Sequence, residues 1–256
     1  MADSISVSVA DRIATVTLNR PPVNAFNADM FRAFNGILDR LATRADWSVL
    51  HIRSAIKVFS GGADLGEIST HLASADKMQA AARITGPFQD LFQRICDLPQ
   101  VSLAEIGGAA MGGGLELALG CDLRIAANEA KLGLPEVGLG LLPGGGGTQR
   151  LTWIAGPAVA ARIILAVDSV DGKAARELGM LQWAVPQQDL AAEAKQIAAR
   201  LATLPPLALA ACKVCMRLAS DPERNGFAAE TEWTGRLLAT EETQRRISDF
   251  LAGVRR

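Results

Sequence analysis

Histidine and cysteine, which carry much of the nucleophilic and metal chemistry of enzymes, are scarce in this sequence. The 256 residues include two histidines, His51 and His71, and neither adjoins a candidate serine or cysteine nucleophile. A Gly-x-Ser-x-Gly motif is also missing, which argues against a Ser-His-Asp hydrolase. The four cysteines do not suggest a disulfide scaffold. Cys212 and Cys215 form a lone Cys-x-x-Cys in an apolar helical stripe, which favours buried structural thiols over a metal or redox site.

An excess of charge of one sign and long apolar runs are lacking as well. Lys and Arg number 26 against 27 Asp and Glu, and the basic residues are scattered, so nothing indicates a surface for nucleic acid or an anionic membrane. The longest apolar runs, such as 207–212, fall far short of the ~20 residues that span a bilayer. Residues 1–10 alternate in polarity, unlike a signal peptide. We therefore expect a cytoplasmic protein with no nucleic-acid or membrane partner.

The spacing of the apolar residues predicts an α/β protein whose last part is helical. Alternation predicts a hairpin of two strands, with its turn at Asp11 and Arg12. Helices alone follow residue 185. The predicted strands cover residues 5–9, 13–17, 47–54, 100–108 and 121–128, and the predicted helices cover 28–46, 71–98, 111–120, 157–167, 171–180, 190–204, 207–218, 224–238 and 241–252.

Two glycine-rich turns each follow a predicted strand. They are KVFSGGADLGEI (57–68) and GGAAMGGGLELALG (107–120). Glycine has no Cβ, so a ligand can approach the backbone N–H groups of such turns closely. In the second turn these N–H groups also stand at the start of a helix, where unpaired donors and the helix dipole favour negative charge. Two such donors aimed at one point would form an oxyanion hole. Alternatively, both are tight turns that need glycine for their geometry alone.

The familiar phosphate-binding motifs are incomplete in this chain. GLGLLP (138–143) starts like a dinucleotide fingerprint but has Pro143 at its sixth position instead of glycine. GGGGTQR (144–150) lacks the Gly-Lys-Ser/Thr ending of a P-loop.

Two glutamates stand among apolar and glycine residues. Glu116 lies one turn inside the glycine-led helix, and Glu136 is the only acidic residue between Glu129 and Asp168. Such a carboxyl group is on the surface, in a structural pair, or kept for acid–base chemistry. Burial would raise its pKa toward the working range of a general acid.

Taken together in this order, the motifs are specific. VTLNRPPVNAFN, FSGGADL, GGAAMGGGLELALGCDLRIA, LGLPEVGLGLLPGGGGTQRL and AARELGMLQWAVP resemble the enoyl-CoA hydratase/isomerase (crotonase) superfamily, and the resemblance covers nearly the whole chain. It implies a β-β-α spiral core with the oxyanion hole and acyl-CoA site over residues 1–188. It also implies a helical lid or oligomerisation region over 189–256, and a homotrimer or a dimer of trimers.

The resemblance also implies roles for individual residues. The N–H groups of Ala63 and Gly113 would bind the thioester oxygen of an acyl-CoA, Glu116 would be the base that holds water, and Glu136 would donate the proton to C2. Such a reaction needs no metal or cofactor, since the coenzyme A thioester is the substrate. Further substrate-binding positions implied by the resemblance are Ala25, Gly61, Gly62, Asp64, Leu65, Gly112, Pro135, Gly144 and Phe250.

Other branches of the superfamily match less well. Simple 3-enoyl-CoA isomerases use one glutamate, usually at the position of Glu136, so isomerisation stays the alternative to hydration. Dienoyl-CoA isomerases and aryl-CoA dehalogenases need an aspartate where this chain has Gly144. A non-enzymatic binder of acyl-CoA or RNA is a third class, but the helix expected to bind RNA, 31–45, has three arginines offset by Asp39. The acyl pocket is expected along residues 67–89 and 152–157.

Overall fold

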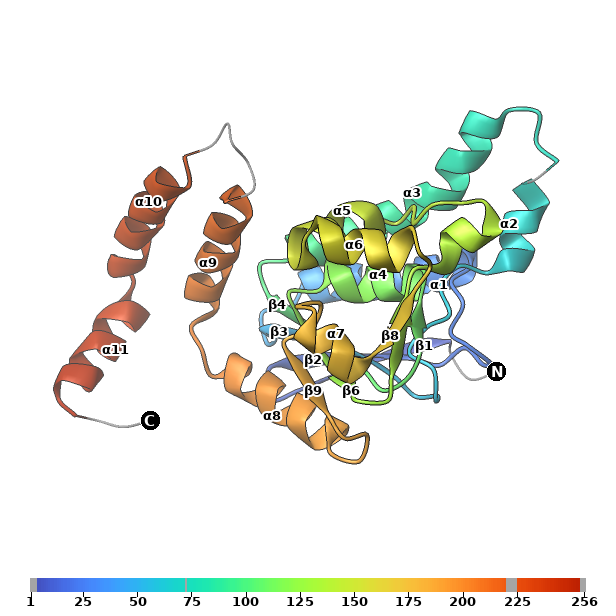
Figure 1. The fold of residues 1–256 in the computed structure, drawn as a ribbon. Coiled ribbons are helices and arrows are strands. Elements are labelled where there is room, and N and C mark those ends of the chain that lie inside the picture. Colours follow the sequence, from blue (N-terminus) through green and yellow to red (C-terminus); the bar gives the residue numbers. More distant parts are fainter. Residues whose placement is uncertain (1–3, 72, 220–224, 254–256) are drawn as a thin grey trace. The chain divides into compact units, whose positions relative to one another are not determined.

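A six-stranded sheet forms the frame of the protein (Figure 1). The computed structural model describes residues 4–71, 73–219 and 225–253. The strands lie in the order β1, β2, β3, β4, β6, β9; β1 and β2 are antiparallel and the remaining pairs are parallel. Their bounds are β1 (Ile5–Ala10), β2 (Ile13–Leu18), β3 (Val49–Ser54), β4 (Val101–Ile106), β6 (Leu123–Ala127) and β9 (Trp183–Val185).

The sheet confirms the five predicted strands and adds β9 at one edge. The hairpin turn is also confirmed, because Asp11 and Arg12 have φ angles of 51° and 64°. Two consecutive residues with positive φ make the tight turn that matches the twist of a two-residue hairpin.

A second, three-stranded sheet includes the strand that directly precedes the glycine-led helix. β5 (Ala110–Met111) pairs in parallel with β7 (Lys131–Gly133), which pairs antiparallel with β8 (Ser169–Asp171). The Gly112 N–H extends this pairing by donating to the Gly133 carbonyl oxygen at 3.0 Å. Strands of two or three residues are too short to show an alternation, which is why the sequence did not predict them.

Three helices follow the first strands. α1 (Ala28–Ala42) begins at Asn27, whose side chain accepts a hydrogen bond from the Met30 N–H. The single helix predicted over 71–98 is wrong at its start: α2 (Leu65–His71) precedes it, and α3 (Lys77–Asp97) begins at the capping residue Asp76. α2 has no buried residue, so no apolar periodicity in the sequence marks it.

The glycine-led helix α4 (Gly113–Gly120) is buried along its whole length. It begins two residues later than predicted, because Met111 belongs to β5 and Gly112 takes a positive φ of 52°. After α4 the chain forms the 3₁₀ helix η1 (Pro135–Leu139), then α5 (Gly147–Ala155), α6 (Pro157–Ile164) and α7 (Gly172–Glu177).

The chain divides into two compact units, Met1–Ala202 and Thr203–Arg256. The first includes α8 (Leu190–Ala202), which packs on β2, β3, β4 and β6 with Leu190, Ala194, Ile197, Ala198 and Leu201 buried. The boundary between the two compact units lies at 202/203, one helix after the boundary expected at 188/189. The reason is that the apolar face of α8 packs on the sheet of the first unit.

The second unit consists of α9 (Pro206–Leu218), α10 (Gly226–Leu238) and α11 (Glu241–Leu251). These match the predicted helices, although the expected start of the second, Arg224, lies outside the described residues. Neither α10 nor α11 has a buried residue. The expectation of buried thiols is wrong for Cys212, which is exposed, whereas Cys215 is half-buried.

In the described part of the chain no single helix is long and apolar enough to cross a membrane. One bent pair of helices, α8 with α9, reaches the required length and composition together.

Candidate active site

A cavity of about 940 Å³ in the first unit gathers most of the predicted site residues. Arg20, Pro21 and Pro22 line it, and so do Ala80 and Ile84 of α3, Leu139 at the end of η1 and Leu142 after η1. The predicted residues that line it are Ala25, Gly61, Ala63, Asp64, Leu65, Gly112, Gly113, Glu116, Pro135, Glu136 and Gly144. Gly62 does not line the cavity. Phe250, on α11 of the second unit, is exposed and stays a prediction.

The first glycine turn is fixed by a short parallel bridge between Phe26 and Ala63. The Phe26 N–H donates to the Gly62 carbonyl at 2.7 Å, and the Asp64 N–H donates to the Phe26 carbonyl at 2.9 Å. In this pairing the N–H of Ala63 faces away from Phe26. Among the described residues it has no hydrogen-bond acceptor.

The second glycine turn packs directly against the first. Gly62 has a φ of 90°, and a Cβ at Gly62 would lie 2.8 Å from both the Gly113 nitrogen and the Met111 carbonyl oxygen. Gly113 is the first residue of α4, so its N–H has no acceptor within the helix. Among the described residues it donates to no other group. Two free N–H donors, from Ala63 and Gly113, therefore lie on adjoining segments that line one cavity.

The Glu116 side chain is buried and held through one of its oxygens. Oε1 accepts hydrogen bonds from the N–H groups of Gly145 at 2.8 Å and Gly147 at 2.7 Å. A Cβ at either glycine would lie within 2.9 Å of a Glu116 carboxyl oxygen, so only glycine permits this approach. Burial raises the pKa of Glu116 to about 7, and the nearby Glu136 adds to the rise. The two N–H donors and the charge of Arg150 act in the opposite direction.

The glycine loop that holds Glu116 is itself braced from two helices. Arg150 on α5 donates to the Gly145 carbonyl at 2.8 Å and to the Gln93 side chain at 3.0 Å. Gln89 on α3 donates to the Gly144 carbonyl at 2.7 Å. Sequence reasoning assigned no individual role to these three side chains. The only signals were that Arg150 lies within the GGGGTQRL motif and that Gln89 ends the stretch 67–89 where the acyl pocket was expected.

Glu136 lies in η1 directly after Pro135, with its carboxyl group against the bare Cα of Gly112. A Cβ at Gly112 would lie 2.7 Å from Oε1 of Glu136. Oε2 is buried and has no hydrogen-bond partner among the described residues. Burial raises the pKa of Glu136 above its ordinary value. This rise increases the share of the protonated form relative to an exposed glutamate, and the protonated form can donate a proton into the cavity.

An ion pair in the lining of the cavity connects the loop after β2 to the residue that precedes α2. Arg20 reaches Asp64 at 2.8 Å and also donates to the Ala25 carbonyl at 2.9 Å. The Asp64 carboxylate in turn accepts from the Gly66 N–H at 3.0 Å, and the Arg20 guanidinium lowers its pKa. Asp64 thus lines the cavity with its charge already paired. Arg20 is a further residue of this site that the sequence did not indicate.

Comparison with known proteins places this geometry in a family. The family model for enoyl-CoA hydratase/isomerase matches residues 9–253. A probable enoyl-CoA hydratase of Bacillus subtilis is 38% identical over 81% of this chain and 80% of its own length. The 2,3-dehydroadipyl-CoA hydratase of Escherichia coli is 34% identical over 96% of this chain and 94% of its own.

Solved structures agree in fold. DspI of Pseudomonas aeruginosa has a TM-score of 0.90 at 32% identity and covers 98% of this chain and 94% of its own. An enoyl-CoA hydratase of Bacillus anthracis has a TM-score of 0.89 at 28% identity, covering 98% and 97%. The expected β-β-α core with a helical C-terminal region is therefore confirmed. The chain belongs to the enoyl-CoA hydratase/isomerase (crotonase) family and is most like its enoyl-CoA hydratases.

Proposed function

We propose that this chain adds water to 2-enoyl-CoA thioesters and produces 3-hydroxyacyl-CoA. The observation that carries the proposal is the pair of carboxyl groups, Glu116 and Glu136, whose pKa values are both raised in a cavity with two free N–H donors. The relatives named as enoyl-CoA hydratases support it. Their names include crotonyl, short-chain and 2,3-dehydroadipyl esters, so they leave the acyl group open.

In this proposal the two N–H donors bind the thioester oxygen. As the water oxygen bonds to C3, electrons move onto the thioester oxygen, where Ala63 and Gly113 N–H stabilise the negative charge. Gly113 begins α4, so the helix dipole adds to this stabilisation. The missing side chains at Gly112 and Gly113 leave room for the Glu136 carboxyl group and the Phe88 ring, which a Cβ at these positions would meet at 2.7 and 2.5 Å.

The two glutamates divide the proton transfers. Glu116 has one oxygen held by the glycine loop, while Oε2 has no partner among the described residues and can accept a proton from the attacking water. Glu136, protonated, delivers its proton to C2 as the enolate collapses. The two groups influence each other, so they are expected to titrate as a unit.

The test is a spectrophotometric assay with crotonyl-CoA, which follows the loss of the conjugated enoyl-thioester absorbance. We expect rapid loss with the wild type and a fall of about a thousandfold or more in Glu116→Gln and Glu136→Gln. Near-normal rates in both variants would refute the two-glutamate mechanism. A 3-enoyl-CoA ester is run beside it. Formation of the conjugated ester there, with no hydration, would instead favour the isomerase, with Glu136 essential and Glu116 dispensable.

We further propose that the protein assembles as a homotrimer or a dimer of trimers. The second unit supports this, because Phe227 and Phe250 are each 82% exposed and Leu251 is 78% exposed. Large apolar side chains left exposed on helices without buried residues are typical of a protein–protein contact. Analytical ultracentrifugation tests the assembly: a mass of one chain at micromolar concentration would contradict it.

A further inference from the structure

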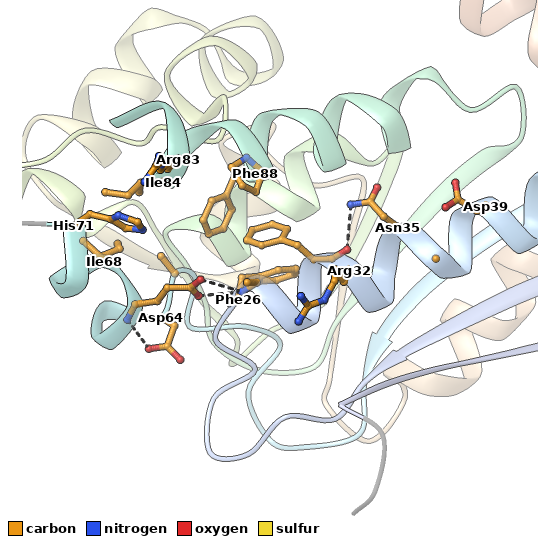
Figure 2. Close-up of a pocket in the computed structure, with 16 residues that line it drawn as sticks. Phe26, Arg32, Asn35, Asp39, Asp64, Ile68, His71, Arg83, Ile84 and Phe88 are labelled. Atoms are coloured by element: carbon orange, nitrogen blue, oxygen red, sulfur yellow. Dashed lines mark hydrogen bonds between the residues drawn. The ribbon is translucent and has the colours of Figure 1, made fainter. Parts of the chain in front are cut away.

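A second cavity, of about 570 Å³, adjoins the one that holds the glutamates (Figure 2). It lies among α1, α2 and α3. Six residues line both cavities, and one of them is Ala63, the proposed donor to the thioester oxygen. The shared residues are Ala63, Asp64, Ile68, His71, Ile84 and Phe88. An acyl chain whose carbonyl group lies at Ala63 can therefore extend into the second cavity.

The middle of this cavity is apolar. Phe31 packs edge-on against Phe88 with ring centroids 4.7 Å apart, and Phe26 lies 5.3 Å from Phe31. Ile68 and Ile84 add aliphatic surface from α2 and α3 (Figure 2). Such walls suit the methylene groups of an acyl chain.

The carboxylates around this cavity are already engaged. Asp64 pairs with Arg20 at 2.8 Å, and Asp39 pairs with Arg94 at 2.5 Å. Glu67 accepts a hydrogen bond from the Ala28 N–H at 3.0 Å at the start of α1.

The basic residues that line this cavity are less completely paired than its carboxylates. Arg32 pairs with Asp29, but the Arg83 guanidinium has no hydrogen bond or ion pair within the described residues. The His71 side chain, on the facing helix α2, also has no partner there. Figure 2 shows both residues at the same end of the cavity, beside Ile84 and Ile68. Ile68, His71 and Ile84 also line the first cavity, so the unpaired Arg83 stands at the end of the second cavity that adjoins the first, where an acyl chain leaving Ala63 enters.

We propose that the second cavity binds an acyl chain whose far end carries a carboxylate, with Arg83 as the residue that recognises it. The inference rests on the proposed function and names its substrate class, the 2-enoyl-CoA esters of dicarboxylic acids. The planar guanidinium of Arg83 can donate two parallel hydrogen bonds to a carboxylate, and His71 can donate a third.

The test compares two saturated esters of equal chain length, adipyl-CoA and hexanoyl-CoA, which cannot be hydrated. Calorimetry gives the Kd of each for the wild type, Arg83→Gln and Arg83→Glu. Arg83 is exposed, so its ion pair with the carboxylate is expected to be weak. Neutralising Arg83 should therefore raise the ratio of the adipyl-CoA Kd to the hexanoyl-CoA Kd by about fivefold. Charge reversal should raise the ratio further. The matched control is Arg176→Gln, an arginine on α7 that is likewise exposed and lines neither cavity, and its ratio should not move.

The outcomes separate this inference from the proposed function. An unchanged ratio in both Arg83 variants would overturn the inference, as would an equal weakening of both esters, which would mean that Arg83 meets a coenzyme A phosphate. Circular dichroism confirms that each variant is folded. Hydration of crotonyl-CoA and of the 2-enoyl-CoA ester of adipic acid by the wild type is measured separately. If both are absent while the ratio still depends on Arg83, the proposed reaction is wrong and the carboxylate site stands.

Discussion

Replacing Glu116 by glutamine should stabilise the protein at alkaline pH while it removes the activity. The pKa of Glu116 is raised from 4.5 to about 7, chiefly by burial. Between these pH values the folded chain keeps a proton that the unfolded chain has released, so wild-type stability falls as the pH rises through this window. At 1.36 kcal/mol for each factor of ten, the loss at pH 8 is about 3 kcal/mol.

The glutamine variant avoids this loss. Its amide oxygen can still accept from Gly145 and Gly147, and it has no charge to bury. A chain of this size gains about 2–4 °C in Tm for each kcal/mol, so we expect the variant to melt about 6–12 °C above the wild type at pH 8. At pH 4.5 or below, the two proteins should melt at similar temperatures.

The assay is differential scanning calorimetry of both proteins across this pH range, with Glu177→Gln, an exposed glutamate on α7, as the matched control. A Tm difference that does not change with pH would refute the reasoning, because it would mean that ionisation of Glu116 costs the folded state nothing.

Three further substitutions test the geometry around the glutamates. Gly112→Ala places a Cβ 2.7 Å from Oε1 of Glu136 and should lower kcat by about a hundredfold with the circular dichroism spectrum retained; a normal kcat would contradict the assigned position of that carboxyl. Arg150→Gln removes a charge that lowers the pKa of Glu116, so the acidic limb of the kcat/KM profile should move to higher pH, and an unmoved limb would exclude that coupling. Gly114→Ala brings a Cβ to 2.2 Å from a backbone carbonyl oxygen and should cost about 3 kcal/mol or more in urea unfolding, where a change below about 1 kcal/mol would be inconsistent with the packing.

The sequence predicted the elements that have a clear period. The five longer strands of the main sheet and the amphipathic helices such as α1 and α8 follow from apolar spacing, because one face of each is buried. The elements that it missed are short or bury little. α2 buries nothing, α5 buries only Gly147 and Leu151, and β5 holds two residues that are fixed by pairing with β7.

The site was predictable to a similar degree. The two glutamates and the glycine turns stood out as departures from an ordinary apolar core. The supports Arg20, Gln93 and Arg150 did not, because an arginine or glutamine that bonds a distant carbonyl has the same local sequence as one that faces solvent. The second cavity was foreseen in part: residues of the stretch 67–89, where the acyl pocket was expected, line it, whereas residues 152–157 line neither cavity. Its wall from α1 was missed, because it forms only when α1 packs beside α3.

The contacts that Glu116 receives from Gly145 and Gly147 come from main-chain atoms, and so do the free donors at Ala63 and Gly113. An alanine scan cannot delete such groups, since every substitution except proline keeps its N–H. Truncation mapping of this site would therefore highlight the two glutamates and pass over most of the machinery around them. Saturation mutagenesis would instead identify the glycines of the site. Any substitution there adds a side-chain atom where the neighbouring groups leave no room, so these positions should tolerate no other residue.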